Sequence, residues 1–168
     1  GMILAEDGGK MSKSRPGSVI NPDDVVRKYG ADAFRVYEMF IGAFDQAIPW
    51  STGGLAGCRR FLDRVWSLQS RILPRDDIRT SMLHATHVMI DKVSGDYERM
   101  KFNTAIAALM GYVNEVSRTE GITRGEMRIL LSLLHPVAPH VTEEMRVAAY
   151  LDPKPFHQGS WPVADASY

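Results

Sequence analysis

Apolar residues return every three or four positions along most of this chain. The clearest stripe lies in residues 102–116 and consists of Phe102, Ile106, Leu109, Met110, Val113 and Val116. The same spacing in residues 55–72, 81–95 and 123–135 predicts three more amphipathic helices. These stripes are more typical of a core than of a ligand pocket. The pattern predicts a mainly α fold built around a helical bundle.

Start and stop signals place two helices before the bundle and one at its end. Asn21 can cap a helix that begins at Pro22, and Gly30 can end it. A second helix is expected over residues 31–41. Pro139 has the position of a first helical residue after the break at Pro136, which predicts the last helix.

The two ends and the middle of the chain have irregular patterns. Residues 2–4 form a short apolar run before the turn signal of residues 6–9, which predicts a β-hairpin-like loop returning through Lys10 and Met11. Residues 42–54, which contain Pro49, predict a linker. We therefore expect two domains, residues 1–50 and 51–168. The tail, residues 151–168, is expected to pack as an extended strap.

Composition narrows the function classes. The 168 residues carry a formal net charge of zero, so the whole chain lacks the basic excess of an independent nucleic-acid binder. Any RNA contact must come from a local patch. The single cysteine, Cys58, excludes an internal disulfide and fits a buried helix face in a reducing compartment. No apolar run approaches the roughly 18 residues that cross a bilayer, so we expect a cytoplasmic protein without membrane contact.

The most specific motif is the basic loop Lys10-Met11-Ser12-Lys13-Ser14. At average residue usage, five specified letters arise by chance in about one chain of this length in ten thousand. Two lysines on a glycine-flanked backbone can converge on one polyanion, and Ser12 and Ser14 add hydroxyl donors. Such a loop can close over a triphosphate and stabilise the charge that develops on leaving pyrophosphate. The alternative is a solvated basic loop or a phosphorylation site.

A run of arginines follows the linker. Arg59, Arg60, Arg64 and Arg71 lie on the polar face of the helix predicted for residues 55–72, and the run continues to Arg75 and Arg79. This run is the best local candidate for contacts with RNA phosphates. The alternative for each arginine is a solvated helix face balanced by nearby aspartates.

The histidines do not predict a metal site. His84 and His87 are three residues apart on one helical face, a spacing that can ligate a metal, but no third ligand is evident. His135 and His140 flank prolines at a helix junction, where we expect them to bond local backbone groups.

The loop and its flanks, from residues 1–4 through Lys13 to residues 19–23, resemble the second signature of class I aminoacyl-tRNA synthetases. Other stretches are similar to the leucine-specific enzymes of that family: residues 29–35, 40–42, 49–50, 57–66 and 102–106, and the segment Leu134-His135-Pro136-Val137-Ala138-Pro139-His140 with Glu143 and Glu144. The valine, isoleucine and methionine enzymes are nearer alternatives. A stand-alone helical interaction module is the alternative from another class.

The resemblance implies the end of a catalytic domain, with helices that contact the tRNA stem, followed by a helical domain of the anticodon-binding type. It implies ATP with Mg²⁺ and leucine as substrates of the full-length enzyme, and tRNA(Leu) as its partner. Lys10, Met11, Ser12, Lys13 and Ser14 would contact ATP, with Lys13 and Lys10 catalytic. We expect a monomer whose contacts reach the tRNA body.

The chain departs from the family pattern at three points. The segment Arg15-Pro16-Gly17-Ser18-Val19 is one residue longer than usual, and Arg146 stands near the place of a usual tryptophan. The family's first signature, His-Ile-Gly-His, is absent from these residues, so we expect a fragment that has no ligase activity alone.

Overall fold

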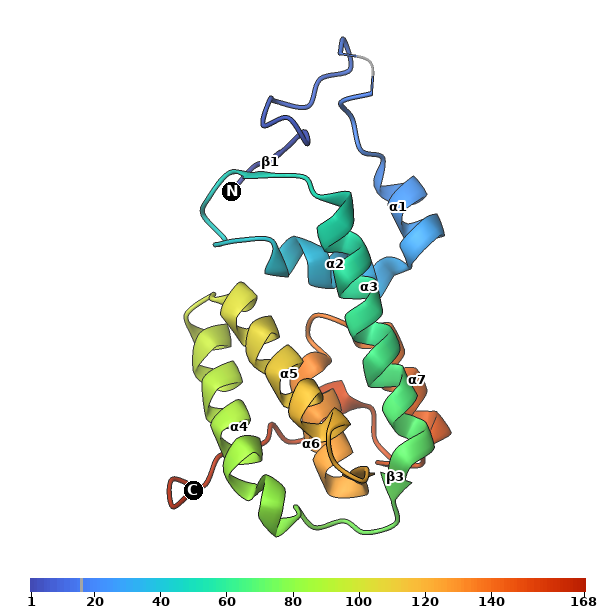
Figure 1. Cartoon of the computed structure of the whole chain (residues 1–168), viewed down its shortest axis with the longest axis vertical. Helices are drawn as coiled ribbons and strands as arrows, with labels where there is room; N and C mark the ends of the chain where they lie inside the picture. The colour runs from blue at the N-terminus through green and yellow to red at the C-terminus, as the bar shows by residue number, and fades with distance from the viewer. Residues whose placement is uncertain (16) are drawn as a thin grey trace.

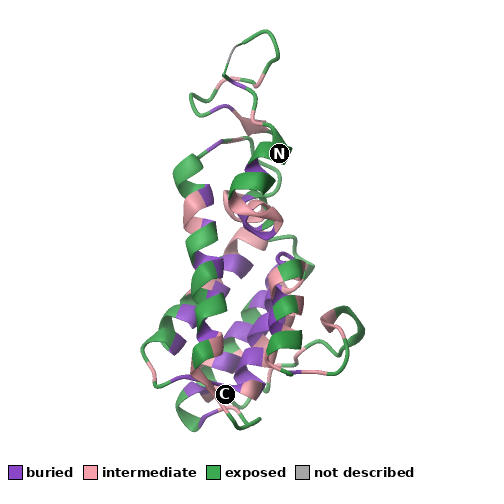
Figure 2. Cartoon of the chain, turned by 90° about the vertical axis from the view of Figure 1, so that its right-hand side faces the viewer, coloured by how far each residue is buried: buried purple, intermediate pink, exposed green. Residues whose placement is uncertain are grey.

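The computed structural model describes residues 1–15 and 17–168, and seven α-helices dominate these residues. A helical bundle forms one end, and a smaller extension that carries a long loop forms the other (Figure 1). Buried residues line the facing sides of the bundle helices, whereas the loop of the extension is mostly exposed (Figure 2). The mainly α prediction is confirmed. Within the described residues no helix is both long and apolar enough to span a membrane.

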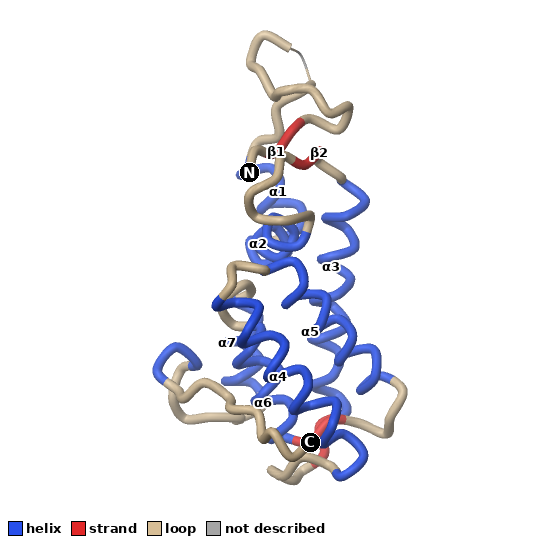
Figure 3. Tube along the Cα trace, turned by 90° about the vertical axis from the view of Figure 1, so that its left-hand side faces the viewer, coloured by secondary structure: helices blue, strands red, loops and turns tan. Residues whose placement is uncertain are grey.

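The extension begins with strand β1 (Ile3–Leu4), which pairs in parallel with β2 (Ile48–Pro49) beneath the loop (Figure 3). The predicted turn forms, since Ala5 N–H donates to Gly9 O at 2.8 Å. The backbone returns through Lys10 and Met11 without forming a second strand. Parallel strands need a long crossover connection. The two helices between residues 22 and 40 supply that crossover, so β2 takes the place beside β1.

Helices α1 (Pro22–Tyr29) and α2 (Ala31–Phe40) fill this crossover as the start and stop signals predict. Asn21 Oδ1 accepts the N–H of Asp23 at 3.0 Å and caps α1. Gly30 has a φ of 90°, a conformation that glycine adopts without strain, and it separates the two helices.

Helix α3 (Thr52–Ser67) joins the extension to the bundle. Its predicted apolar face is confirmed, with Leu55, Cys58, Phe61 and Val65 all at most 1% exposed. Burial raises the pKa of the Cys58 thiol to about 11, so it remains an unreactive thiol at neutral pH.

The predicted extension of α3 to Ile72 is wrong. After Ser67 the chain tightens into a 3₁₀ turn, η1 (Leu68–Arg71), and then forms strand β3 (Ile72–Leu73). This strand pairs in parallel with β4 (Ile122–Thr123), a tertiary contact that the local periodicity does not encode.

Four helices complete the bundle. A short 3₁₀ helix, η2 (Thr80–Met82), leads into α4 (Leu83–Glu98), which is followed by α5 (Phe102–Ser117), α6 (Arg124–Leu134) and α7 (Pro139–Ala148). The apolar stripe of α5 is buried as predicted except for Phe102 and Met110, which are half-buried.

One hydrophobic core runs through both parts of the molecule. It includes Val25 and Val36 from the extension, Phe61 from α3, and Leu109 and Leu131 from the bundle. Such a continuous core packs the helices of the extension against the bundle. The division of the chain at residue 50 stays a prediction.

Arg79 is not part of a basic surface. Its guanidinium is buried and pairs with the fully buried carboxylate of Glu126, with Nη2 and Oε2 2.8 Å apart. Glu126 also accepts the N–H of Thr123, whose hydroxyl caps α6 in return, so a capping box holds this carboxylate inside the bundle. The prediction of Arg79 as a candidate phosphate contact is therefore wrong.

The tail packs as an extended strap, as predicted. The N–H of Phe156 donates to Glu143 at 2.6 Å, and a 3₁₀ helix, η3 (Phe156–Gln158), follows. Farther along, the indole N–H of Trp161 donates to Ser94 on α4 at 2.8 Å. Arg146 faces the strap and donates to the carbonyl of Asp152 at 2.7 Å.

The buried pair yields a stability prediction. Glu126→Gln leaves the guanidinium of Arg79 without its counter-charge, which in a buried pair costs about 3–5 kcal/mol of unfolding free energy. The matched control is Arg27→Ala, which removes an exposed arginine paired with Asp24 and should cost at most about 1 kcal/mol. Urea unfolding followed by circular dichroism measures both. Equal losses in the two variants would contradict the structural role of the buried pair.

Candidate nucleotide loop and basic helix face

The Lys-Met-Ser-Lys-Ser motif lies at the tip of the extension, at the far end of the molecule from the bundle (Figure 1). Lys10 and Lys13 are exposed, and among the described residues neither ammonium group makes a hydrogen bond or an ion pair. Gly8 and Gly17, on either side of the motif, have φ values of 79° and 75°. The backbone therefore turns at both flanks through conformations that suit glycine, and it leaves the two cations free.

The hydroxyl groups of the motif hold the loop itself. Ser12 Oγ lies 2.8 Å from Ser14 Oγ, and Ser14 N–H donates weakly to Ser12 Oγ at 3.3 Å. Ser18, which is buried, accepts the N–H of Ser12 at 3.1 Å and lies 3.0 Å from its carbonyl. We expected Ser12 and Ser14 to be donors for a ligand. In this conformation both hydroxyls belong to an internal network.

Asp7 and Arg15 lie on the two sides of the motif, at the base of the loop, and their ion pair closes this neck. The N–H of Gly9 donates to the same carboxylate at 2.9 Å, and this bond, together with Arg15, lowers the pKa of Asp7 despite partial desolvation. Arg15 and Ser18, both in the stretch that is one residue longer than usual, thus have structural partners. Pro16, the other unusual residue there, lies outside the described residues.

Beneath the neck is a hollow of about 310 Å³ between the loop and the start of α3. Its lining includes Glu6, Arg15 and Thr52. Glu6 accepts the hydroxyl of Thr52 at 2.8 Å, so this carboxylate is already in use. Among the described side chains of the loop, the two lysine ammonium groups are available as donors, and two such groups fit a polyphosphate.

The four arginines predicted to contact RNA differ in the partners that their guanidinium groups bind. Arg59 donates to Asp63 at 2.9 Å and to the carbonyl of Tyr29 at 3.0 Å, which braces α3 against α1. Arg64 donates to Asn114 on α5 at 2.5 Å. Arg60 is exposed, and among the described residues its guanidinium has no hydrogen bond or ion pair.

Arg71 has a different role. It donates to the carbonyls of Ser117 and Thr119, so it neutralises the negative end of α5. Arg75, farther along the predicted basic run, pairs with Asp77, and this hydrogen bond raises the pKa of its guanidinium. The basic run is therefore not a single phosphate-binding surface.

A second hollow, of about 490 Å³, lies where α2, α3 and α7 meet. Arg59 and the half-exposed indole of Trp66 form part of its lining, but so do the carboxylates of Asp32, Asp63 and Glu144. Three carboxylates repel a phosphate group. This hollow is therefore a poor site for the RNA backbone.

Two of these histidines contact backbone groups of the tail, and the other two contact side chains. His84 and His87 contact the tail, His84 at the carbonyl of Tyr168 and His87 at the N–H of Asp165, so they do not form a metal pair. The expected backbone bonds of the other two rings are wrong. His135 lies 2.9 Å from the hydroxyl of Thr142, and His140 lies 2.7 Å from the carboxylate of Asp32.

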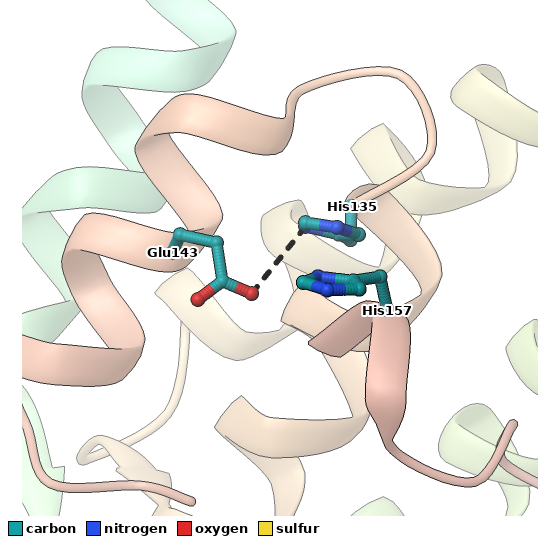
Figure 4. Close-up of side chains that lie close together, drawn as sticks. All are labelled: His135, Glu143 and His157. Carbon is teal, nitrogen blue, oxygen red and sulfur yellow. Dashed lines mark ion pairs between the residues drawn. The ribbon is translucent and has the colours of Figure 1, made fainter. Parts of the chain in front are cut away.

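Sequence reasoning missed a cluster of His135, Glu143 and His157 (Figure 4). Burial lowers the pKa of His135, although Glu143 opposes this shift. Burial alone would raise the pKa of Glu143, but hydrogen bonds from Arg146 and the N–H of Phe156 outweigh it and lower the pKa. The only sequence signal was a histidine in the tail, whose position depends on how the strap folds back.

Comparisons with known proteins agree with this architecture. Residues 1–51 match the family model of class I tRNA synthetases (I, L, M and V), and residues 80–168 match that of the anticodon-binding domain of tRNA ligase. The second match covers more than half of the chain. The first match contains the whole lysine loop.

Relatives with curated names are leucine–tRNA ligases. The chain is 52% identical over 145 residues to the enzyme of Alkaliphilus oremlandii (strain OhILAs), which covers 86% of the chain and 18% of that protein. It is 45% identical over 174 residues to the enzyme of Prosthecochloris aestuarii (strain DSM 271 / SK 413), which covers 98% of the chain and 21% of that protein. The chain therefore spans about a fifth of the length of these relatives.

A solved structure shows the same fold. The ternary complex of LeuRS, tRNA and LeuAMS from Agrobacterium radiobacter K84 agnB2 matches with a TM-score of 0.83 and 29% identity, over 99% of this chain and 24% of that chain. The shared fold, the family models and the curated relatives all lead to one assignment. The chain belongs to the leucine–tRNA ligases of the class I tRNA synthetases, and it corresponds to a part of such an enzyme.

Proposed function

We propose that this chain is the part of a leucine–tRNA ligase that contacts the phosphates of ATP and braces the body of tRNA(Leu). The contact with ATP rests on one observation. The ammonium groups of Lys10 and Lys13 are exposed and have no partner among the described residues, on a loop whose neck is closed by the Asp7–Arg15 ion pair. Leucine specificity rests on the named relatives, because no leucine pocket can be assigned to these residues.

In the proposed reaction the carboxylate of leucine attacks the α-phosphate of ATP, and pyrophosphate leaves. A ribose hydroxyl of the terminal adenosine of the tRNA then takes the leucyl group from the adenylate, and AMP leaves. Negative charge develops on the leaving pyrophosphate, and an ammonium group placed beside it stabilises the transition state more than the ground state. Lys13 has this role in the proposal. Lys10 and the serine network shape the loop around the triphosphate.

Magnesium accompanies ATP in this proposal. Mg²⁺ commonly keeps several waters and binds substrate phosphates through one or two carboxylates. Asp7, the carboxylate at the neck of the loop, is already paired with Arg15. We therefore assign no magnesium ligand to the loop.

The RNA contact is assigned to the exposed face of α3, with Arg60 as its best-supported residue. The guanidinium of Arg60 has no partner among the residues that the structure describes, whereas Arg59 and Arg64 divide their donors between the protein and solvent. In support, the homologous solved structure contains tRNA, and the family model of residues 80–168 is named for anticodon binding. The ligase is proposed to act as a cytoplasmic monomer.

Removal of the proposed catalytic cation gives the first functional prediction. In the full-length ligase, Lys13→Ala should lower the rate of adenylate formation by roughly a hundredfold and change leucine affinity less than about twofold, because the charge acts on the transition state. Pyrophosphate exchange and leucine binding measure the two effects. Lys28→Ala, an exposed lysine of α1, is the control and should change neither quantity. Equal losses in rate and affinity, or no loss in either, would reject the role.

The basic helix face gives the second prediction. Arg60→Ala should weaken tRNA binding by roughly five- to tenfold at low salt and reduce the slope of log affinity against log salt by about 1, because one phosphate contact is lost. Lys101→Ala, an exposed lysine between α4 and α5, is the control. Filter binding at several salt concentrations measures both variants. Unchanged slopes for Arg60→Ala would exclude it from the interface.

The chain alone gives the third prediction. The 168 residues contain the lysine loop but no His-Ile-Gly-His signature, so purified protein of this length should show no leucine-dependent pyrophosphate exchange. Exchange above the level of a Lys13→Ala control would contradict the proposed division of the active site.

A further inference from the structure

The cluster of His135, Glu143 and His157 joins three elements at the side of the bundle (Figure 4). His135 is the C-terminal cap of α6, Glu143 lies in the first half of α7, and His157 lies in η3 of the strap. Only the folding back of the tail brings the third residue to the other two. The cluster lies in the bundle, whereas the lysine loop lies at the tip of the extension (Figure 1).

The three side chains present ligand atoms to one another. One ring nitrogen from each histidine and one carboxylate oxygen of Glu143 all lie within 4.8 Å of one another. Oε1 of Glu143 is 4.0 Å from Nδ1 of His135. The two imidazole rings lie nearly parallel, 20° apart, with their centres separated by 6.4 Å.

Surrounding groups hold two of these side chains in place. The hydroxyl of Thr142 lies 2.9 Å from Nδ1 of His135. It orients the ring when Nε2 binds an ion, and it must give up this contact when Nδ1 does. Arg146 donates to Oε2 of Glu143 at 2.7 Å, and the N–H of Phe156 donates to Oε1 at 2.6 Å. Outer hydrogen bonds of this kind orient the ligands of metal sites. The bond to Arg146 leaves Oε1 as the oxygen that faces the histidines.

The cluster is accessible. It lines an open hollow of about 640 Å³ whose other walls include Pro139 and Val147. His157 is exposed, and its one hydrogen-bond contact within the described residues is Gln158, at 3.3 Å. An ion and a water ligand can therefore enter without displacing the core.

We propose that His135, Glu143 and His157 form a binding site for a zinc-class transition-metal ion. Two imidazoles and one carboxylate suit Zn²⁺ and its neighbours better than Mg²⁺ or Ca²⁺, which prefer oxygen ligands. Three protein ligands leave a fourth position for water. The site is independent of the proposed ligase function, because none of its residues touches the lysine loop.

Metal binding requires a small local contraction. Donor atoms at about 2.0–2.1 Å from a tetrahedral ion are roughly 3.3 Å apart, so the three ligand atoms must move together by about 1 Å. His157 can supply most of this movement, because it is exposed and lies in a three-residue helix at the surface. The bound ion would then tie the strap to the junction of α6 and α7.

Zinc titration tests the site. The 168-residue protein, treated with chelator and then dialysed at pH 7.5, is titrated with Zn²⁺ by calorimetry. We expect a single ion with micromolar affinity, a rise in Tm on zinc addition because the ion binds the folded state, and visible absorption bands when Co²⁺ replaces zinc. His157→Ala should weaken binding at least tenfold without lowering the Tm of the metal-free protein, because this ring is exposed.

His84→Ala is the matched control, since it removes another exposed histidine that contacts the tail. It should leave zinc affinity within about twofold of the unsubstituted protein. Glu143→Gln keeps the size of the side chain and should also weaken binding at least tenfold. The absence of stoichiometric binding in the unsubstituted protein, or binding that survives His157→Ala, overturns the proposal.

Discussion

The packing of α3 against two different parts of the molecule is the constraint on which the rest depends. At its start, Tyr37 of α2 accepts the N–H of Ser51 at 2.6 Å and packs edge-on against Trp50 with ring centres 4.8 Å apart. A side chain at Gly54 would come within 3.1 Å of the Tyr37 ring, so glycine permits this close approach. Farther along, Phe61 and Val65 enter the core of the bundle. One helix therefore sets the position of the lysine loop relative to the basic helix face.

A buried carboxylate also connects the extension to the bundle, through α2 and α7. Asp32 of α2 is 7% exposed and accepts the N–H of Val141 at 2.6 Å, in the first turn of α7. The positive end of the α7 dipole favours a negative charge there. Arg35, one turn later on α2, donates to the carbonyls of Pro136 and Val137 just before α7. Backbone groups at the start of α7 thus find partners on α2, and the extension is held to the bundle by polar contacts as well as by the core.

Local signals in the sequence predicted most of the helices. The cap of α1 at Asn21, the break at Gly30 and the buried stripe of α5 depend on residues close in the chain, and the structure confirms them. The two parallel strand pairs could not be predicted in this way, because their partners are separated by more than forty residues. The burial of Arg79 was missed for the same reason, since its partner Glu126 lies on another element. The lysine motif was found because five specified letters carry information that needs no tertiary context.

The partners of the basic residues show why the number of positive charges in a stretch could not identify the residues available to bind phosphate. Arg15, Arg71 and Arg79 occur in the same basic stretches as Lys10, Lys13 and Arg60, yet each binds a carboxylate or carbonyl of the protein itself. A guanidinium has five donors in a planar fork and readily joins two segments of chain, whereas an ammonium on a flexible stem is a compact, strongly hydrated charge. The loop shows this difference, because Arg15 pairs with Asp7 at the neck while neither lysine at the tip has a partner within the described part of the chain. The loop can therefore retain its shape and still present two mobile charges to a phosphate chain.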